Sequence, residues 1–470
     1  MQKLNFIEKI GYASGSLGDS ICYAFTGSFC LFFLTTVADI PPATAGIITA
    51  VGSVWNAAFN PVIGFCADRF RSSHGRRRPL IAGFSIPLAL SVALLFTDLP
   101  LPDKYKPIYY GIILIMFWTC YTGYFVPYLA LGVDYTSDYD DRTILRLYAS
   151  AFNTFGSMIC MLIPVNLVSF MSKQGISAAH AWSTVGILMG VTSTISILIT
   201  VAASKKKDPP CESSHSKSIE KTHKNENAIK KIITEYISVA KLKPMRYLLV
   251  ASTSSMITYV MVMAGMVYFF TYNMGLSAFL ISICLTARSV VSLLIVPVVG
   301  SFSLKYDKKN SLICFFLIGA AGMTVLRFTD IEGLFSVTVF ILMIVLCTSV
   351  YWQLVPSMYY DICEYDKIMT GKDREATIVS FQGLVEAVAA GMGNLILGIT
   401  LKTGGFDGEA ALQTHRALSA IFNATTVIPA VFLLISAAAI IKYPINKDVH
   451  TKIREKMEIK SNDYKIRKNV

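Results

Sequence analysis

Long apolar segments recur along almost the whole of this 470-residue chain, and they limit what it can fold into. A helix of about 20 apolar residues crosses a bilayer core of ~30 Å. Twelve segments have a suitable length: residues 11–38, 44–67, 79–98, 107–133, 147–171, 181–203, 246–274, 277–303, 311–328, 333–360, 376–401 and 416–441. Only 15% of the residues are charged, against about 25% in soluble domains. We therefore predict an all-α integral membrane protein with twelve transmembrane helices.

Basic residues are distributed unevenly between the predicted loops. If the helices alternate in direction and both termini are cytoplasmic, the outer loops contain six of the 42 lysines and arginines: Lys104, Lys106, Lys173, Arg327, Lys402 and Arg416. An excess of lysine and arginine in cytoplasmic loops is typical of membrane proteins. The asymmetry predicts cytoplasmic termini and a multi-pass protein of the cytoplasmic membrane. It also accounts for the net charge of +12 without a nucleic-acid partner.

The sequence lacks the motifs of several other function classes. It has no P-loop, so we do not expect ATP to drive its activity. The ten cysteines are scattered singly, and His215 and His223 lack a metal-binding spacing. We expect no enzymatic activity and no metal or other cofactor. We expect the lipid bilayer to surround the protein, and we expect no obligate protein partner.

One long polar interruption divides the predicted helices six and six. The boundaries that follow are an N-terminal bundle over 1–203, a cytoplasmic linker over 204–245, a C-terminal bundle over 246–442 and a basic cytoplasmic tail over 443–470. The linker segment "AIKKIITEYISVAKLK" has apolar residues on one helical face and lysines on the other, which is typical of a helix on a membrane or protein surface. A passive connector is the alternative.

The two halves resemble each other at a constant offset. "SVWNAAFNPVIG" (53–64) aligns with "SVVSLLIVPVVG" (289–300), and a second pair of segments runs from Val-Pro through acidic residues to Asp-Arg. Two six-helix repeats of one orientation are typical of secondary transporters, with a solute site near the midplane between them.

Asp19 lies within the first predicted helix, among small residues such as Gly15 and Gly18. A charge at the bilayer centre costs at least ~3 kcal/mol on insertion scales and usually faces a cavity. The small neighbours leave room beside the carboxyl group. Asp19 is therefore a candidate to accept hydrogen bonds from a hydroxylated solute or to carry a proton. The alternative is a structural pair with a residue such as Arg288, which lies in the eighth predicted helix with no acidic neighbour.

Two further pairs of polar residues lie inside apolar segments. Asn56 and Asn60 are four residues apart, so they share one face of a helix; hydrogen bonds across a helix interface are one explanation. Gln382 and Glu386 have the same spacing in the eleventh predicted helix. We predict that they line the cavity and that Glu386 is a candidate proton carrier, with structural pairing as the alternative.

Charged residues near the helix ends are candidates for a cytoplasmic gate, which would hold one access state closed through ion pairs. They are Asp68 and Arg76 after the second predicted helix, Arg142 and Arg146 before the fifth, and Asp361 and Glu364 at the end of the tenth. Positive-inside topology alone would explain the arginines but not Asp68. Plain structural pairing is the alternative for Asp361 and Glu364.

Several segments together resemble one family. They are "YASGSLGDS", "WNAAFNPVIG" followed by "RSSHGRRRP", "TGYFVPYLAL" and "DICEYDKIMTGKDREATIVSFQG". The chain is similar over essentially its whole length to the glycoside–pentoside–hexuronide:cation symporters of the major facilitator superfamily. The resemblance implies the major facilitator fold, alternating access, and a sugar or glycoside carried with Na⁺, Li⁺ or H⁺. It also implies that Asp19 contacts sugar hydroxyls and that Gln382 is a polar cavity residue.

The sequence departs from the family pattern in its second predicted helix. Cation-coupled members have two aspartates there; here Trp55 and Pro61 keep their places, while the two acidic positions are Asn56 and Asn60. A neutral amide can coordinate Na⁺ through its carbonyl oxygen, but it cannot neutralise the ion or carry a proton. We therefore expect H⁺ rather than Na⁺ as the coupling ion if transport is coupled, with Asp19 or Glu386 as its carrier.

The predicted function is secondary transport of a sugar, a glycoside or a related small organic solute across the cytoplasmic membrane. Four aromatic residues are candidates to stack on its ring: Trp55, Tyr121, Phe125 and Tyr128. An uncoupled facilitator or an exporter of an amphipathic, steroid-like or lipid-like solute is the alternative, because the cavity has lost charge. A receptor that reuses the fold without transport is a third hypothesis.

Overall fold

The computed structural model describes residues 5–70, 72, 75–135, 139–206, 234–328, 333–371, 374–408, 410, 412–447 and 449, a few of them by their backbone alone. The regular secondary structure of these residues is helical. The α-helices are α1 (Phe6–Thr36), α2 (Pro42–Arg69), α3 (Arg78–Leu95), α4 (Lys106–Asp134), α5 (Tyr139–Lys173), α6 (Ala178–Ala203), α8 (Lys243–Tyr268), α9 (Ala278–Tyr306), α10 (Lys308–Phe328), α11 (Gly333–Thr370), α12 (Glu375–Gly404), α13 (His415–Thr425) and α14 (Val427–Ile441).

Twelve spans of these helices are long and apolar enough to cross a membrane, which confirms the predicted number. Eleven contain one α-helix, and the last, His415–Ile441, joins α13 and α14. A short π-helical turn, Phe269–Asn273, extends the span of α8. The protein is therefore a multi-pass membrane protein, as predicted. The cytoplasmic position of both termini stays a prediction.

Proline marks the start of several helices. Pro42, Pro79 and Pro107 occupy the first or second position of α2, α3 and α4, where a missing backbone N–H costs no helical hydrogen bond. At the start of α6, the Ser177 hydroxyl accepts a hydrogen bond from the backbone N–H of His180. These local signals set helix boundaries close to those expected from hydropathy.

The chain forms two compact units. The first contains α1 to α6 with residues 263–289 and 391–424, and the second contains residues 218–262, 290–390 and 425–470. This division does not test the boundaries of the four predicted segments, which follow the order of the chain and stay a prediction.

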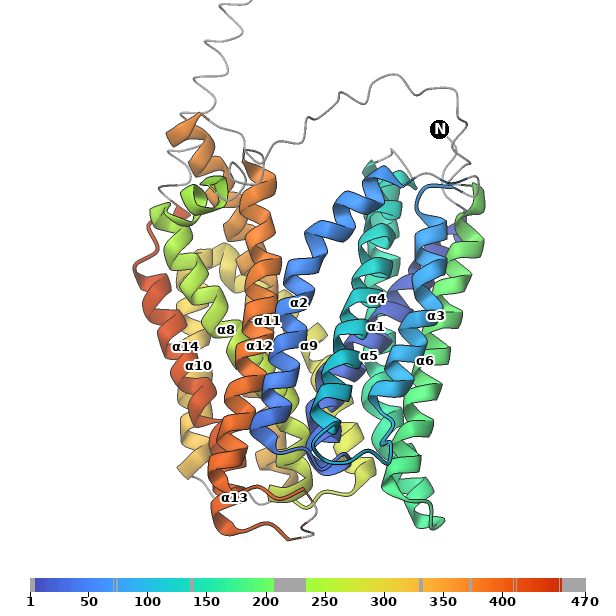
Figure 1. Cartoon of the computed structure of the whole chain (residues 1–470). Helices are drawn as coiled ribbons and strands as arrows, with labels where there is room; N and C mark the ends of the chain where they lie inside the picture. The colour runs from blue at the N-terminus through green and yellow to red at the C-terminus, as the bar shows by residue number, and fades with distance from the viewer. Residues whose placement is uncertain are drawn as a thin grey trace, which may run out of the picture. The chain divides into compact units, whose positions relative to one another are not determined.

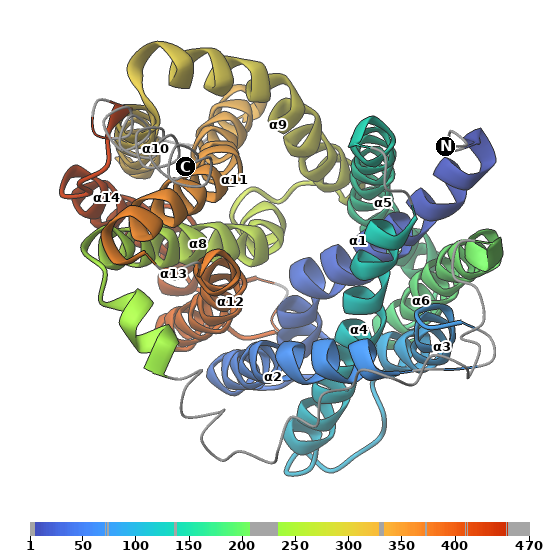
Figure 2. The same ribbon diagram turned by 90° about the horizontal axis from the view of Figure 1, so that it is seen from above.

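In the first unit, α1 packs against α5 and α6, α2 against α4, and α3 against α4 and α6 (Figures 1 and 2). Glycines let α1 come close to its neighbours: a Cβ atom on Gly15 would lie 2.5 Å from the ring of Tyr128, and one on Gly18 would lie 2.8 Å from the backbone oxygen of Ser193. The small residues beside Asp19 are thus in contact with α4 and α6.

Segments from the second half of the chain complete the first unit. Tyr268 and Thr35 share a hydrogen bond of 2.6 Å between their hydroxyl groups. A Cβ atom on Gly398 of α12 would lie 2.4 Å from the backbone oxygen of Pro42. α12 and the start of α2 therefore approach each other closely.

In the second unit, α10 packs against α11 and α14. Residues 234–240 of the predicted linker form a short helix, whose side chains contact Arg374, which precedes α12, and Ser380 within α12. Arg374 donates hydrogen bonds to Asp366 of α11 and to Ser238 of this short helix, the latter at 2.7 Å. Tyr236 shares a 2.7 Å hydrogen bond with Ser380. The described part of the linker helix thus lies on a protein surface, one of the two expected places.

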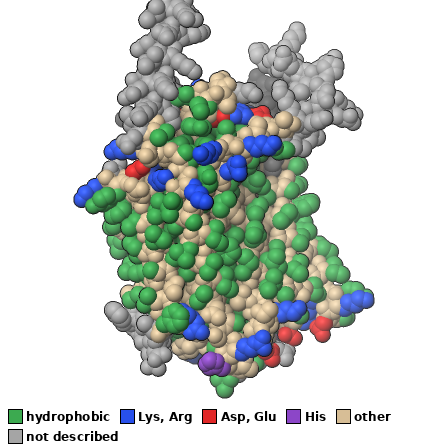
Figure 3. Space-filling view, turned by 90° about the vertical axis from the view of Figure 1, so that its left-hand side faces the viewer, with side chains coloured by type: hydrophobic (Ala, Val, Ile, Leu, Met, Phe, Trp, Pro, Cys, Tyr) green, Lys and Arg blue, Asp and Glu red, His purple; other side chains and the backbone are tan. Residues whose placement is uncertain are grey.

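The outer surface has the polarity expected of a membrane protein. On the side shown in Figure 3, hydrophobic side chains cover the middle of the molecule, while lysine and arginine gather toward its two ends. Exposed apolar residues on α14 include Val431, Leu434 and Ile435. Such a surface is favourable where lipid tails surround it.

Candidate functional site

Asp19 lies in the interior of the first unit and is 7% exposed. The hydroxyl group of Tyr121 on α4 donates a hydrogen bond of 2.7 Å to its Oδ1 atom. The amide of Asn153 on α5 donates a longer one, 3.3 Å, to its Oδ2 atom. Both donors are neutral, and Asn153 itself is exposed. The carboxyl group is therefore one hydrogen bond away from an accessible surface.

Aromatic rings adjoin this carboxyl group. The rings of Tyr121 and Phe125 are stacked, with centroids 5.4 Å apart. The ring centroid of Tyr23 lies 5.8 Å from that of Tyr121. Phe125 is half-buried and Tyr23 is exposed. A carboxyl group beside partly exposed ring faces can bind both the hydroxyl groups and the apolar face of a ring-shaped solute.

The two amides of α2 bind each other and α4. The side-chain nitrogen of Asn60 donates to the backbone oxygen of Asn56 at 3.0 Å and to its Oδ1 atom at 3.3 Å. The same Oδ1 atom accepts a 2.9 Å hydrogen bond from Thr122 on α4. The hydrogen bond across the helix interface agrees with the structural explanation of this pair. It leaves a role in coupling untested.

Trp55 lies next to the amide pair and is 39% exposed. Its ring nitrogen donates a 2.8 Å hydrogen bond to Thr119 of α4, and its ring stacks on Phe59 at 5.6 Å. Thr119 and Thr122 contact α2, whereas Tyr121 contacts α1. α4 therefore connects the amide pair with Asp19.

Tyr128 is buried between α1 and α4. Its hydroxyl group shares a 2.7 Å hydrogen bond with Ser16 and donates to the backbone oxygen of Tyr12 at 3.1 Å. Its ring stacks on that of Tyr12 at 4.8 Å. These contacts give Tyr128 a packing role, and its predicted contact with solute stays a prediction.

Gln382 and Glu386 belong to the second unit. The side-chain nitrogen of Gln382 donates a 3.0 Å hydrogen bond to Glu386 Oε1, so the two share one face of α12 as predicted from their spacing. Both side chains are partly exposed.

The structure describes the side chains of three of the six predicted gating residues. Asp361 forms an ion pair with Lys308, whose Nζ atom lies 2.8 Å from each carboxylate oxygen. Glu364 is partly exposed on the same helix, and Arg76 is partly exposed before α3. The side chains of Asp68, Arg142 and Arg146 lie outside the described residues.

Arg288 has no hydrogen bond or ion pair to any residue that the structure describes. The suggested structural pair with Asp19 is therefore not formed, since Asp19 is bound by Tyr121 and Asn153 instead. The described residues also contain no group of three or more His, Cys, Asp or Glu side chains that could hold a metal ion.

A family model described as MFS/sugar transport protein matches residues 11–447. The chain belongs to this family. The match confirms the resemblance to the glycoside–pentoside–hexuronide:cation symporters of the major facilitator superfamily. As a member of the family, the protein is a secondary transporter rather than an enzyme, as predicted.

Curated relatives of this family member carry the names of transporters. An uncharacterised symporter of Synechocystis is 26% identical, and the alignment covers 99% of both chains. The isoprimeverose transporter of Lactiplantibacillus pentosus is 25% identical over 94% of this chain and 89% of its own. A sodium-dependent lysophosphatidylcholine symporter of Danio rerio is 29% identical over 34% of this chain and 30% of its own.

Solved structures support the fold. A bacterial homologue of the human lysosomal transporter Spinster has a TM-score of 0.68 at 14% identity, covering 93% of this chain and 95% of its own. This likeness and the twelve spans confirm the predicted major facilitator fold.

Sequence reasoning missed several residues of the site in this transporter. Asn153 and Thr122 each lie in an apolar segment, so the argument that selected Asp19 and Asn56 could have selected them too. Lys308, the partner of Asp361, resembled any other basic loop residue. Its role depends on the approach of α10 to α11, which no local pattern predicts.

Proposed function

We propose that this secondary transporter moves a sugar, a glycoside or a related small organic solute by alternating access, coupled to H⁺ rather than Na⁺. The observation that carries the proposal is the arrangement around Asp19: a buried carboxyl group with neutral hydrogen-bond donors beside the stacked rings of Tyr121 and Phe125.

The solute class is supported by the combination of a carboxyl group and ring faces. Carboxylate oxygens accept hydrogen bonds from hydroxyl groups, and the apolar face of a sugar ring packs on an aromatic side chain. Tyr121 is buried and supplies the hydroxyl group that orients Asp19, while its ring stacks on the half-buried Phe125. The name of the isoprimeverose transporter among the relatives agrees with a glycoside.

The choice of H⁺ is supported by the amide pair on α2. Asn56 and Asn60 are neutral, and their side chains are engaged with each other and with Thr122. A Na⁺ ion at this place would meet no carboxylate from either residue. Asp19 and Glu386 have carboxyl groups in membrane-spanning helices, and a carboxyl group can take up and release a proton in place of the lost pair.

Transport into proteoliposomes tests this proposal. The purified protein would first be assayed for counterflow with a panel of labelled glycosides, and then for uptake under an imposed pH gradient or Na⁺ gradient. We expect accumulation above the external concentration under the pH gradient alone. Na⁺-dependent accumulation would overturn the assignment of H⁺.

Variants assign the proton carrier. Asp19→Asn or Glu386→Gln should lower accumulation under the pH gradient at least ~10-fold, which corresponds to about 1.4 kcal/mol. Asp103→Asn is the matched control, since Asp103 is 99% exposed and lies outside the membrane-spanning helices, and it should leave transport unchanged. Full accumulation in both Asp19→Asn and Glu386→Gln would show that neither residue carries the proton.

A second candidate function is uncoupled or outward transport of an amphipathic solute. An open apolar groove of about 350 Å³ lies in the first unit, lined by exposed α2 residues that include Ile47, Val51, Val54 and Trp55, and by Leu395 of α12. Its chemistry suits an apolar chain or a steroid, and the lysophosphatidylcholine symporter among the relatives carries a lipid in its name. Uptake of a labelled lysophospholipid that only reaches equilibrium, with no glycoside counterflow, would favour this function.

A further inference from the structure

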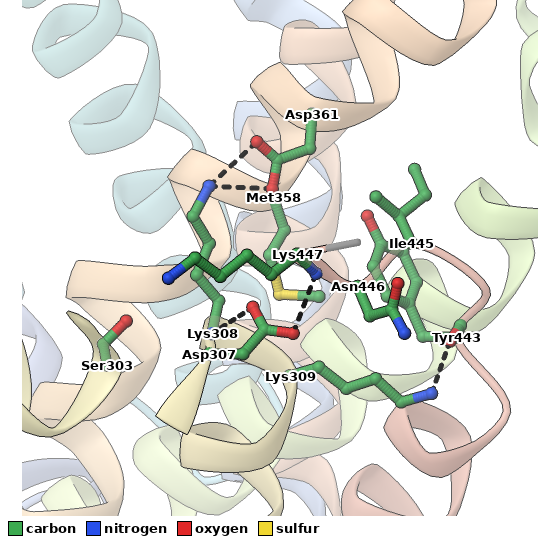
Figure 4. Close-up of a pocket in the computed structure, with 10 residues that line it drawn as sticks. All are labelled: Ser303, Asp307, Lys308, Lys309, Met358, Asp361, Tyr443, Ile445, Asn446 and Lys447. Atoms are coloured by element: carbon green, nitrogen blue, oxygen red, sulfur yellow. Dashed lines mark hydrogen bonds and ion pairs between the residues drawn. The ribbon is translucent and has the colours of Figure 1, made fainter. Parts of the chain in front are cut away.

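A charged cavity of about 180 Å³ lies in the second unit, where α9 ends, α10 begins and the chain leaves α14 (Figure 4). The charged and hydrogen-bonding residues that line it include Asp307, Lys308, Lys309, Asp361, Tyr443 and Lys447. Three lysines therefore face two aspartates, which leaves one excess positive charge. The cavity can hold several water molecules or one small anionic group.

The acidic side chains of this cavity are engaged by the protein. The Nζ atom of Lys308 donates a hydrogen bond of 2.8 Å to each carboxylate oxygen of Asp361. Asp307 accepts hydrogen bonds from the backbone N–H groups of Lys308, at 2.6 Å, and Lys447, at 3.1 Å. Asp307 has a φ angle of 75°, so its backbone is in the left-handed region. These bonds hold it in that conformation.

Two donors in the cavity have capacity left. The Nζ atom of Lys309 donates to the backbone oxygen of Tyr443 at 2.7 Å, and an ammonium group has three hydrogens to donate. The side chain of Tyr443 is 1% exposed. Its hydroxyl group has no hydrogen-bond partner among the described residues. A buried hydroxyl group without a partner is unfavourable, so this site is incomplete as the protein alone forms it.

The surroundings favour an anion as the missing partner. α10 begins at Lys308 and is 21 residues long, and the start of a helix attracts negative charge. The carboxylate of Asp307 already binds the first N–H group of this helix. The exposed Lys305 and Lys442 lie close by in the sequence and add positive charge to this end of the unit. Phosphate oxygens accept hydrogen bonds from both lysine and tyrosine.

We propose that this cavity binds a phosphate group, held by Lys309 and the hydroxyl group of Tyr443. Two sources share this chemistry: the headgroup of an anionic phospholipid and free inorganic phosphate. The predicted topology puts this end on the cytoplasmic side, where basic pockets between membrane helices bind anionic lipid headgroups. The site is separate from Asp19 and does not depend on which solute is carried.

Thermal unfolding of the purified full-length protein in an uncharged detergent tests the site. Phosphatidylglycerol, phosphatidylcholine and inorganic phosphate would be added in separate arms, with native mass spectrometry to count bound lipids. We expect phosphatidylglycerol or inorganic phosphate to raise the unfolding temperature, and phosphatidylcholine to have a smaller effect. The arm that responds identifies the source. No response to either anionic ligand would overturn the proposal.

Variants separate this site from general attraction of anions to a basic surface. Tyr443→Phe removes only the unpartnered hydroxyl group, so the ligand-free protein should stay folded, and binding should weaken measurably. Lys309→Gln should weaken binding at least ~10-fold. Lys442→Gln is the matched control, because this exposed lysine does not line the cavity. Equal losses in Lys309→Gln and Lys442→Gln, or unchanged binding in Tyr443→Phe, would contradict the proposal.

Discussion

Asn56 and Asn60 have different hydrogen-bonding roles although they are chemically identical. The side chain of Asn56 accepts hydrogen bonds through Oδ1, from Thr122 and from Asn60. The side chain of Asn60 donates, to the backbone and side-chain oxygens of Asn56. An aspartate can replace the acceptor without loss of a bond, but an ionised aspartate cannot replace the donor.

We therefore expect Asn60→Asp to lower the free energy of unfolding by about 1–3 kcal/mol more than Asn56→Asp. Thermal unfolding of the two purified variants measures the difference, and each serves as the control for the added charge of the other. Equal effects would show that the donor role of Asn60 contributes little.

The double variant Asn56→Asp with Asn60→Asp tests whether these two positions can bind a cation when both carry a carboxylate. If they can, Na⁺ should raise the unfolding temperature of this variant more than an equal concentration of choline does, because only Na⁺ can be coordinated by the two carboxylates. No difference between the two salts would favour a purely structural role for the wild-type pair.

Close helix packing surrounds the candidate site in the first unit. The small residues of α1 next to Asp19 are in contact with α4 and α6 rather than with open space. Gly18 is the tightest example near Asp19 that involves backbone: a Cβ atom there would lie 2.8 Å from Ser193 O. The position of Asp19 thus depends on α6 as well as on its direct partners.

Gly18→Ala should lower the free energy of unfolding by about 1–3 kcal/mol, because the added methyl group meets the backbone of α6. Gly27→Ala, on the same helix, is the matched control, since a Cβ atom there has no neighbour within 4 Å. Thermal unfolding in detergent compares the two. A similar loss in both variants would point to helix flexibility instead of packing.

Arg374 joins α11 to the described linker helix through Asp366, which is 1% exposed. Arg374→Gln should lower the free energy of unfolding by about 3–5 kcal/mol, because it leaves a buried carboxylate without its cation. The double variant Arg374→Gln with Asp366→Asn should recover part of this loss. Thermal unfolding measures both, and no recovery would mean that the ion pair is not the cause.

The hydrogen bond to Asp366 raises the pKa of Arg374 above its ordinary value. A raised folded-state pKa gives stability that is present below the unfolded-state pKa and is lost only as the pH rises through the folded-state value. Arginine loses its proton only at strongly alkaline pH. The effect of Arg374→Gln should therefore be constant between about pH 6 and pH 9.

Charge asymmetry along the chain predicts how the whole molecule lies in the membrane. Asp103 falls in a predicted outer loop, and Lys305 in a predicted cytoplasmic one. Both are exposed, so a cysteine at either place is reachable by a soluble reagent. The exposed native Cys66, and Cys211 of the predicted cytoplasmic linker, would be replaced by serine first.

A membrane-impermeant maleimide should label Asp103→Cys in intact cells. It should label Lys305→Cys only after the cells are opened. The physical basis is the excess of lysine and arginine on the cytoplasmic side. Labelling of Lys305→Cys in intact cells, with Asp103→Cys protected, would reverse the predicted topology.

Local properties of the sequence were sufficient for the transmembrane helices. Burial in a bilayer requires about 20 consecutive apolar residues, and this requirement is visible without knowledge of any contact. The same argument selected Asp19 and the pair at 56 and 60, because polar groups in apolar segments are rare and costly. The family resemblance followed from short motifs in these helices and in the loops between them.

Only the tertiary structure decided which of these residues meet. Tyr121 and Asp19 were selected separately, and their hydrogen bond depends on the rotation of α4 against α1. Asn153 was missed, and Tyr128 proved to be buried in the contact of α1 with α4. The sequence by itself therefore determined how many helices cross the membrane and which polar groups need partners, since both depend on the local cost of polarity in lipid. Which partner each group has depends on how helices distant in the chain pack side by side, and that is a property of the folded molecule alone.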